Sequence, residues 1–162
     1  MTTKKAEISR QVVTALKACE GKKALHVALL DTSTAPSAFT DFFLICSGSN
    51  PRQIQAIADD VEMQLKQLGL RPNNIEGYNQ AEWVLIDYVD FVVHIFSERA
   101  RQYYDLERLW KSATRLSREE LMSLAGGKRK KAEGEPLRAA RKPAARKRTV
   151  AHKHTTTRRK TK

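Results

Sequence analysis

Glu82 to Phe96 reads EWVLIDYVDFVVHIF, and these two apolar runs, separated by a short break at Val89-Asp90, decide the fold. Their β-branched and aromatic residues predict two strands, and the break predicts the turn of an antiparallel hairpin. Counting outward from that turn gives the side chains that face each other across the strands. The predicted partners are Tyr88 and Phe91, Asp87 and Val92, Leu85 and His94, and Trp83 and Phe96.

Alternation along each strand gives the hairpin two faces of different character. The first face is apolar apart from one tyrosine and is predicted to be core: it comprises Val84, Ile86, Tyr88, Phe91, Val93 and Ile95. The second face is mixed: it comprises Trp83, Leu85, Asp87, Val92, His94 and Phe96. Because the second face is too apolar for open solvent and too polar for an interior, it is the first candidate for a site.

Three interpretations fit the residues of the second face. In the first, a helix of the same chain covers the face, and Asp87 bonds His94 across the strands as a satisfied structural pair. In the second, the face is a docking patch with an apolar centre and charges that orient a partner. In the third, Asp87 and His94 act as an acid/base pair.

The segments before the hairpin alternate between helical and strand patterns. Helical spacing of apolar residues predicts a first helix from about Ile8 to Gly21. Strands are predicted in KALHVALLDTS (23–33) and in TDFFLICSG (40–48), the latter apolar enough to be covered on both faces. Asn50 is the predicted cap of a second helix, with Pro51 at its first position and Gln53 as capping-box partner. The apolar stripe of this helix is predicted to be Ile54, Ile57, Val61, Leu65 and Leu68.

After the second helix, residues 71–80 read as a loop or a short edge strand before the hairpin. Beyond the hairpin, Ser97 is the predicted cap of a helix that continues to about Ser112. Its apolar side is predicted to be Tyr103, Leu106, Leu109 and Trp110. A short last helix is expected at Ser117, where SREE fits a capping box. Strands that alternate with helices predict an α/β domain.

The sequence does not contain the residue pattern of a catalytic site. Gly48-Ser49 before a helix is a feature of nucleotidyltransferases, which also need two aspartates directed at one metal ion. Asp59 and Asp60 are neighbours on a predicted helix and cannot both point at one ion. Asp87 and Asp90 have opposite strand parity. We therefore expect a protein that is not an enzyme and holds neither a cofactor nor a metal.

The sequence also indicates a compartment. Cys19 and Cys46 have no further cysteine or histidine at metal-ligand spacing, so both are predicted to be small buried residues in a reducing environment. The opening MTTKKAEISR leads into a helical pattern without an apolar signal core, and no segment approaches the length of a membrane span. We expect a cytoplasmic protein without membrane contact.

Charge divides the chain near residue 125. Residues 1–125 hold 15 Lys+Arg against 16 Asp+Glu, whereas residues 126–162 hold 15 Lys+Arg against 2 Glu. The second part lacks aromatic residues, so a folded domain (1–125) and a disordered basic tail (126–162) are predicted. RNA is the natural partner of the tail, and a solubilising tail without a partner is the alternative. The candidate nucleic-acid contacts are Lys128, Arg129, Lys130, Lys131, Arg141, Lys142, Arg146, Lys147 and Arg148.

Four pieces of the body, in order and in spacing, resemble the ribosomal silencing factor family (RsfS, also called Iojap). They are TDFFLICSGSNPRQIQAIADDVE (40–62), Glu76-Gly77, the Trp83–Phe96 hairpin and YDLERLW (104–110). The resemblance covers about Ile8 to Trp110. It implies a mixed β-sheet flanked by helices, with a nucleotidyltransferase-like topology but without the catalytic aspartates.

The resemblance also implies a function. Family members bind a protein of the large ribosomal subunit where the small subunit would dock, which blocks subunit joining and represses translation when nutrients are short. Acidic groups in the patch would suit a basic ribosomal protein. The candidate protein-binding residues are Glu76, Trp83, Leu85, Asp87, Asp90, His94, Tyr104 and Glu107.

Further partners and one alternative follow from the same observations. The tail is expected to reach ribosomal RNA, and an open apolar patch predicts a homodimer of the free protein. The alternative function is a general RNA- or DNA-binding protein that acts through its basic tail. Two features depart from the family: the tail itself, and Val89 where members usually have Gly. A β-branched residue resists the positive φ of a tight hairpin turn, so a wider or different turn is expected.

Overall fold

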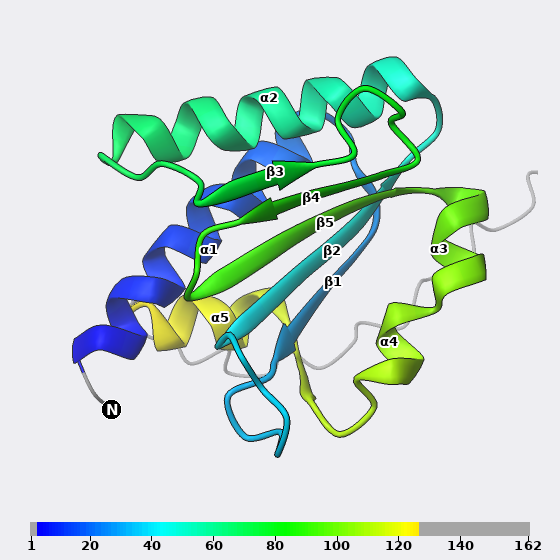
Figure 1. Cartoon of the computed structure of the whole chain (residues 1–162). Helices are drawn as coiled ribbons and strands as arrows, with labels where there is room; N and C mark the ends of the chain where they lie inside the picture. Colours follow the sequence, from blue (N-terminus) through cyan, green and yellow to red (C-terminus); the bar gives the residue numbers. More distant parts are fainter. Residues whose placement is uncertain (1–2, 127–162) are drawn as a thin grey trace, which may run out of the picture. The chain divides into compact units, whose positions relative to one another are not determined.

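The computed structural model describes residues 3–126, which form a mixed sheet with helices packed against it (Figure 1). The elements are α1 (Thr3–Gly21), β1 (Leu25–Asp31), β2 (Phe42–Gly48), α2 (Pro51–Gln67), β3 (Asn74–Glu76), β4 (Trp83–Asp87), β5 (Phe91–Ser97), α3 (Glu98–Tyr104), α4 (Leu106–Leu109), β6 (Thr114–Leu116) and α5 (Arg118–Leu124). The six strands lie in the order β3-β4-β5-β2-β1-β6, with β2 and β5 parallel. The predicted mixed sheet flanked by helices is confirmed.

The β4–β5 hairpin has the predicted register. The observed partners include Trp83 and Phe96, Leu85 and His94, and Asp87 and Val92. The predicted pairing of Tyr88 with Phe91 appears as a hydrogen bond of 3.0 Å from the Tyr88 N–H to the Phe91 carbonyl. Strand β3 adds to β4 in antiparallel fashion. Residues 71–80 therefore contain the short edge strand.

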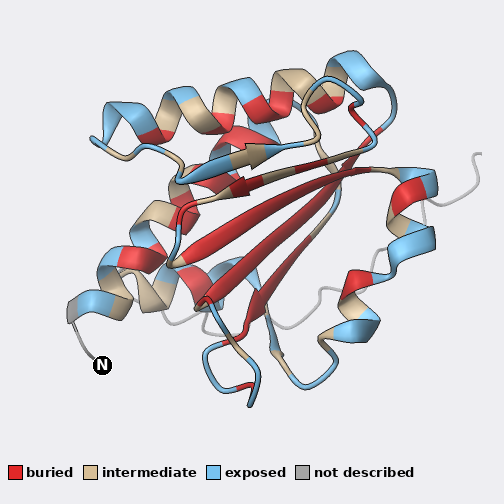
Figure 2. Cartoon of the chain, viewed as in Figure 1, coloured by how far each residue is buried: buried red, intermediate tan, exposed pale blue. Residues whose placement is uncertain are grey.

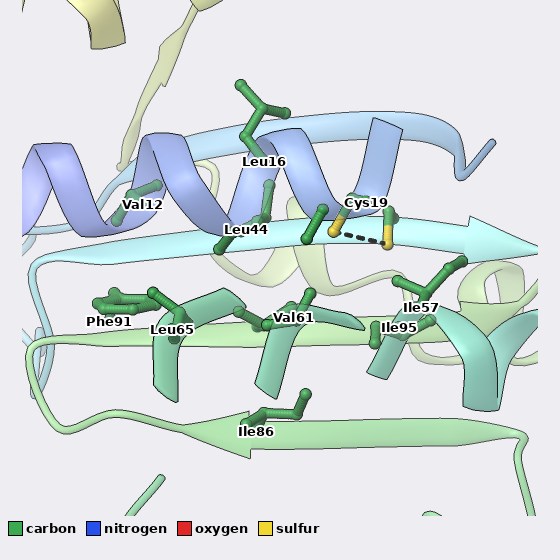
Figure 3. Close-up of a cluster of buried hydrophobic side chains, with 14 of the residues drawn as sticks. Val12, Leu16, Cys19, Leu44, Ile57, Val61, Leu65, Ile86, Phe91 and Ile95 are labelled. Atoms are coloured by element: carbon green, nitrogen blue, oxygen red, sulfur yellow. Dashed lines mark hydrogen bonds between the residues drawn. The ribbon is translucent and has the colours of Figure 1, made fainter. Parts of the chain in front are cut away.

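The first face of the hairpin belongs to the main core. All residues of β2 are buried, as predicted for a strand covered on both faces (Figure 2). The side chains of α1, α2 and the first face meet in one cluster that includes Val12, Leu16, Leu44, Ile57, Val61, Leu65, Ile86, Phe91 and Ile95 (Figure 3). Cys19 and Cys46 are both buried there, with their sulfur atoms 4.0 Å apart.

Helix α2 begins as the sequence predicts, apart from one contact. The Asn50 side chain accepts a hydrogen bond of 2.9 Å from the Gln53 N–H, and Pro51 is the first helical residue. The Gln53 carboxamide oxygen accepts from the Ser49 N–H at 2.7 Å, one residue before the predicted capping-box position. The predicted apolar stripe is too long by one residue, because the helix ends at Gln67 and leaves Leu68 exposed.

The single helix predicted from Ser97 to about Ser112 is wrong. It ends at Tyr104, because Asp105 adopts a left-handed conformation (φ 42°) and its N–H returns to the Arg101 carbonyl at 3.0 Å. Helix α4 then starts in a new direction. As a result Leu106 is buried, whereas Tyr103 and Leu109, both predicted for the apolar side, are exposed.

The last part of the domain contains one unpredicted strand and one predicted helix. Strand β6 pairs with Leu29–Asp31 of β1, and its three residues are too few to show an alternating pattern. The capping box of α5 is confirmed. Ser117 accepts a bond of 3.1 Å from the Glu120 N–H, and the Glu120 carboxylate accepts one of 2.7 Å from the Ser117 N–H.

The tail predicted at 126–162 lies outside the described residues apart from Gly126, and so do all its candidate RNA contacts. The division of the chain near residue 125 therefore stays a prediction. Within residues 3–126, no helix combines the length and the apolar character needed to cross a membrane.

Candidate functional site

The two faces of the sheet are covered to different extents. On the first face, α1 and α2 bury the predicted core residues of the hairpin. On the second face, α3 packs on β5 and β2, at the end of β5 away from the β4–β5 turn (Figure 1). Trp83, Leu85 and Asp87 of β4 stay half-buried there. Together with exposed Tyr104 of α3, which contacts Trp83, these residues are termed the β4 patch.

Trp83 is held in position by three neighbours. Its indole Nε1–H donates to His94 Nδ1 at 3.1 Å. Its ring stacks on Phe96, with centroids 5.0 Å apart and an interplanar angle of 25°, and meets Tyr104 at 4.6 Å. Because the ring is fixed before any partner arrives, binding through it costs little side-chain entropy. The sequence predicted the position of this residue but not its bond to His94.

His94 lies beneath the patch rather than on its surface. The side chain is only 4 % exposed, and burial lowers its pKa to about 4, so the ring is neutral near pH 7. Since Nδ1 accepts the indole bond, Nε2 carries the proton. Nε2 has no hydrogen-bond partner among the described residues, and the imidazole and Phe43 rings lie nearly perpendicular with centroids 4.9 Å apart.

The interpretation that pairs Asp87 with His94 is wrong. Asp87 instead accepts a hydrogen bond of 2.7 Å from the Val89 N–H. Of the two expected alternatives, a wider or a different turn, the structure has a different turn, although Val89 adopts the positive φ (70°) that a β-branched residue was expected to resist. The Asp90 N–H bonds the Tyr88 carbonyl at 2.9 Å, so three residues complete a γ-turn. Without a bond between Asp87 and His94, the acid/base interpretation also loses its geometric basis.

The other predicted acidic residues have different surroundings. Glu76 is exposed on edge strand β3, opposite Leu85 of the patch, and accepts a bond of 2.7 Å from the Asn74 side chain. Asp90 is the last residue of the turn and forms an ion pair of 3.2 Å with Lys4. Glu76 and Asp87 are therefore carboxylates on the two adjacent strands β3 and β4.

Glu107 is engaged by Arg101 across the break between α3 and α4. The Arg101 guanidinium donates to the Glu107 carboxylate at 2.5 and 3.2 Å and to Ser47 Oγ at 3.0 Å. Burial alone would raise the pKa of the Glu107 carboxyl, but the hydrogen bonds and charge of Arg101 outweigh burial and lower it. The charge of Glu107 is thus largely neutralised by Arg101 within the domain, and this ion pair holds α3 and α4 together.

The residues considered for catalysis have structural roles. A Cβ at Gly48 would lie 2.6 Å from the Ile54 side chain, and Ser49 Oγ donates to Gln53 at 2.8 Å. Asp59 accepts a bond of 3.0 Å from the Tyr78 hydroxyl. Within residues 3–126, no group of three or more His, Cys, Asp or Glu side chains is placed to hold a metal ion. The arrangement on the second face suits recognition of a surface.

Sequence reasoning missed the exposed aromatic residue Phe39. Phe39 lies in the loop before β2, is 71 % exposed, and meets Phe43 at 5.9 Å and Trp110 at 6.0 Å. Trp110 in turn contacts the Phe43 ring edge-on at 5.2 Å. A lone aromatic residue in the polar segment 32–41 was the available signal. These rings extend the aromatic surface of the second face across β2.

Comparisons with known proteins show which sequences this chain resembles. The sequence model of a family described as "Ribosomal silencing factor during starvation" matches residues 5–156. A protein of Halalkalibacterium halodurans named ribosomal silencing factor RsfS is 42 % identical over 109 residues, which cover 67 % of this chain and 92 % of the relative. A mouse protein named for mitochondrial assembly of the ribosomal large subunit is 32 % identical over 75 residues, covering 44 % of this chain and 33 % of that protein.

The fold has solved counterparts. A crystal structure of a protein from Chromobacterium violaceum is similar with a TM-score of 0.61 and 35 % identity. The similarity covers 63 % of this chain and 84 % of that protein. The architecture described above is therefore one that related sequences adopt in crystals.

Proposed function

The chain belongs to the ribosomal silencing factor family, and from this membership we propose that it prevents ribosomal subunits from joining. In this proposal the β4 patch binds a protein of the large subunit at the face where the small subunit docks. The folded domain then occupies the space that the small subunit needs. The name of the mouse relative, which refers to assembly of the large subunit, supports the choice of that subunit. The action is steric, with no bond made or broken.

The observation that carries the proposal is the half-open aromatic surface around Trp83. Trp and Tyr dominate the binding energy of protein interfaces, and their contributions are largest where neighbours exclude water. Trp83 has this setting, because Phe96, His94 and Tyr104 enclose one side of its ring and leave the side chain half-buried. The helices of the first face provide no comparable surface.

The charges around the patch fit a basic protein. Asp87 and Glu76 lie on adjacent strands β4 and β3, with Asn74 of β3 directly opposite Asp87. Ribosomal proteins are generally basic, so these carboxylates would favour and orient the encounter. Such rim charges act mainly on the rate of association, whereas the aromatic centre sets the lifetime of the complex.

Light scattering of purified ribosomal subunits tests the proposal. The protein should reduce the association of large with small subunits, and Leu85→Ala should require about tenfold more protein for the same reduction. Leu68→Ala is the matched control, because Leu68 is an exposed leucine at the end of α2. Unfolding curves of both variants exclude a general loss of structure. Full inhibition by a folded Leu85→Ala variant would show that the β4 patch is not the docking site.

For the tail, we propose an auxiliary contact with ribosomal RNA that raises the effective concentration of the domain at its site. The two parts of the chain differ in charge, because residues 1–125 hold 15 Lys+Arg against 16 Asp+Glu and residues 126–162 hold 15 Lys+Arg against 2 Glu. A variant that lacks 127–162 should bind large subunits more weakly but still block joining at high concentration. Complete loss of binding would instead favour a general nucleic-acid-binding protein that acts through the tail.

The open patch also favours pairing of two copies in the free protein. Sedimentation of the full chain at increasing concentration should reveal a dimer, and Leu85→Ala should weaken it. Dimerisation that Leu85→Ala leaves unchanged would place the contact elsewhere.

A further inference from the structure

The β4 patch continues into a surface of opposite charge that extends from α3 through α4 to β6. This α3–β6 surface consists of exposed Tyr103, Arg108, Leu109, Lys111 and Arg115. Tyr103 joins it to the patch, because its ring meets that of Tyr104 at 5.0 Å. Tyr103 of α3 lies beyond the end of β5, about 20 Å along the strand from the β4–β5 turn (Figure 1). Arg115 of β6 pairs with Leu30 of β1 and is therefore level with the first residues of β2 and β5.

Tyr103 presents a free aromatic face. Its side chain is 81 % exposed, and its contact with Tyr104 is edge-on at 87°, which leaves ring surface uncovered. Beside it lies a hollow of ≈ 420 Å³ lined by Tyr103, Tyr104, Asp105, Arg108 and Leu109. A tyrosine ring next to a guanidinium group and an apolar side chain is the kind of platform on which unpaired bases stack.

The charges of this surface select the partner. Arg108, Lys111 and Arg115 are exposed cations. Glu107 in the same segment is paired with Arg101, and the charge of Arg115 also helps to lower the pKa of its carboxyl. Among the residues that line the hollow, only Asp105 is acidic. A basic ribosomal protein, which suits Asp87, would be repelled here, whereas phosphate groups would be attracted.

We propose that the α3–β6 surface binds an unpaired segment of ribosomal RNA next to the protein that the β4 patch contacts. A base stacks on Tyr103, and phosphates lie against Arg108, Lys111 and Arg115. The inference rests on the proposed function for its location on the large subunit. Stacking of this kind tolerates any base, so the protein contact at the β4 patch supplies the specificity of the site.

Site-specific photo-crosslinking separates this inference from the proposed function. p-Benzoylphenylalanine replaces either Tyr103 or Leu85 in the full chain, which is bound to purified large subunits and irradiated. We expect position 103 to crosslink to RNA and position 85 to a protein. A crosslink to protein from position 103, or none while position 85 reacts, overturns the RNA contact and leaves the proposed function standing. Failure of both positions on bound protein overturns both.

Binding measurements with the full chain give a second test. Tyr103→Ala should weaken binding to large subunits about fivefold or more. A double variant, Arg108→Ala with Lys111→Ala, should lower the slope of log affinity against log salt by about 1.4. The matched control is Lys17→Ala with Lys66→Ala, which removes two exposed cations from α1 and α2. Equal slopes for the two double variants, or unchanged affinity for Tyr103→Ala, would overturn the inference.

Discussion

The two faces of the sheet are built on the same strands, yet one is closed and the other is half open. The difference lies in the helices that pack on each face. Helices α1 and α2 have 19 and 17 residues, so at about 1.5 Å per residue they run the length of the strands. Helices α3 and α4 have 7 and 4 residues and reach only part of the second face. The open surface is thus a consequence of helix length, which in turn depends on the break at Asp105.

The two faces also differ in the hydrogen bonds of their buried polar side-chain atoms. The cluster on the first face is made of aliphatic and aromatic side chains and two cysteines, and the buried hydroxyl of its Tyr88 has no hydrogen-bond partner among the described residues. The second face buries the imidazole of His94 and satisfies one of its nitrogens with the indole of Trp83. A closed face thus gains its stability from packing, whereas an open face retains polar contacts that fix its rings in position. Four substitutions or conditions test this difference, from the largest effect to the smallest.

Phe91→Ala should have the largest effect, because Phe91 is fully buried on the closed face. Loss of a buried Phe leaves a cavity and costs about 4 kcal/mol of unfolding free energy. Phe39→Ala on the open side is the matched control and should cost about 1 kcal/mol or less, since Phe39 is exposed. Urea denaturation measures both values. Similar losses for the two variants would mean that the second face is as important for stability as the first.

Acid should weaken the second face through His94. Burial lowers the pKa of His94 from 6.5 to about 4. Between these pH values the imidazole is protonated in the unfolded chain but neutral in the folded chain, so acid favours unfolding. This stability is complete above about pH 6.5 and falls by about 3 kcal/mol as the pH drops to 4. Unfolding free energies of wild type and His94→Gln across this range give the comparison. A wild-type curve parallel to that of the variant would contradict the neutral, buried imidazole.

The hairpin register and both faces could be predicted because each depends on local rules. Alternation fixes the partners of Trp83 and Leu85, and the cap at Asn50 follows from its own side chain and the next three residues. The break at Asp105 depends on a non-local bond, since Arg101 reaches Ser47 on β2 and Glu107 beyond the break. The periodic apolar pattern of the sequence continues through Asp105, and it gives no sign that Arg101 contacts Ser47 and Glu107.

The predicted pair of Asp87 and His94 failed for a related reason. Both residues have a competitor that strand parity does not reveal: the Val89 N–H lies two residues from Asp87, and the Trp83 indole lies diagonally from His94. Short polar side chains bond the backbone of a nearby turn more readily than a distant side chain. The site residues on β4 could therefore be located from the sequence, but their hydrogen bonds could not.

Trp83→Phe tests the polar contact that fixes the open face. Phenylalanine keeps much of the ring packing on Phe96 but removes the donor to His94, whose Nδ1 is then buried without that bond. An unsatisfied buried acceptor costs about 2 kcal/mol, less than the loss at Phe91. Chemical denaturation gives the value. His94→Gln combined with Trp83→Phe closes a double-mutant cycle, and additive effects would show that the two side chains are not coupled.

Val89→Gly should have the smallest effect and the opposite sign. A positive φ is costly for a β-branched residue, whereas glycine adopts it freely. Val89 is 61 % exposed, so little apolar burial is lost, and the bond from its N–H to Asp87 is kept. The relief of strain exceeds the added entropy of the unfolded chain, and the variant should gain about 1 kcal/mol of stability. Val12→Gly, at a buried helical position, should lose stability in the same assay. A loss at Val89 as well would mean that its side chain supports the end of the open face, and that the turn belongs to the packed part of the molecule.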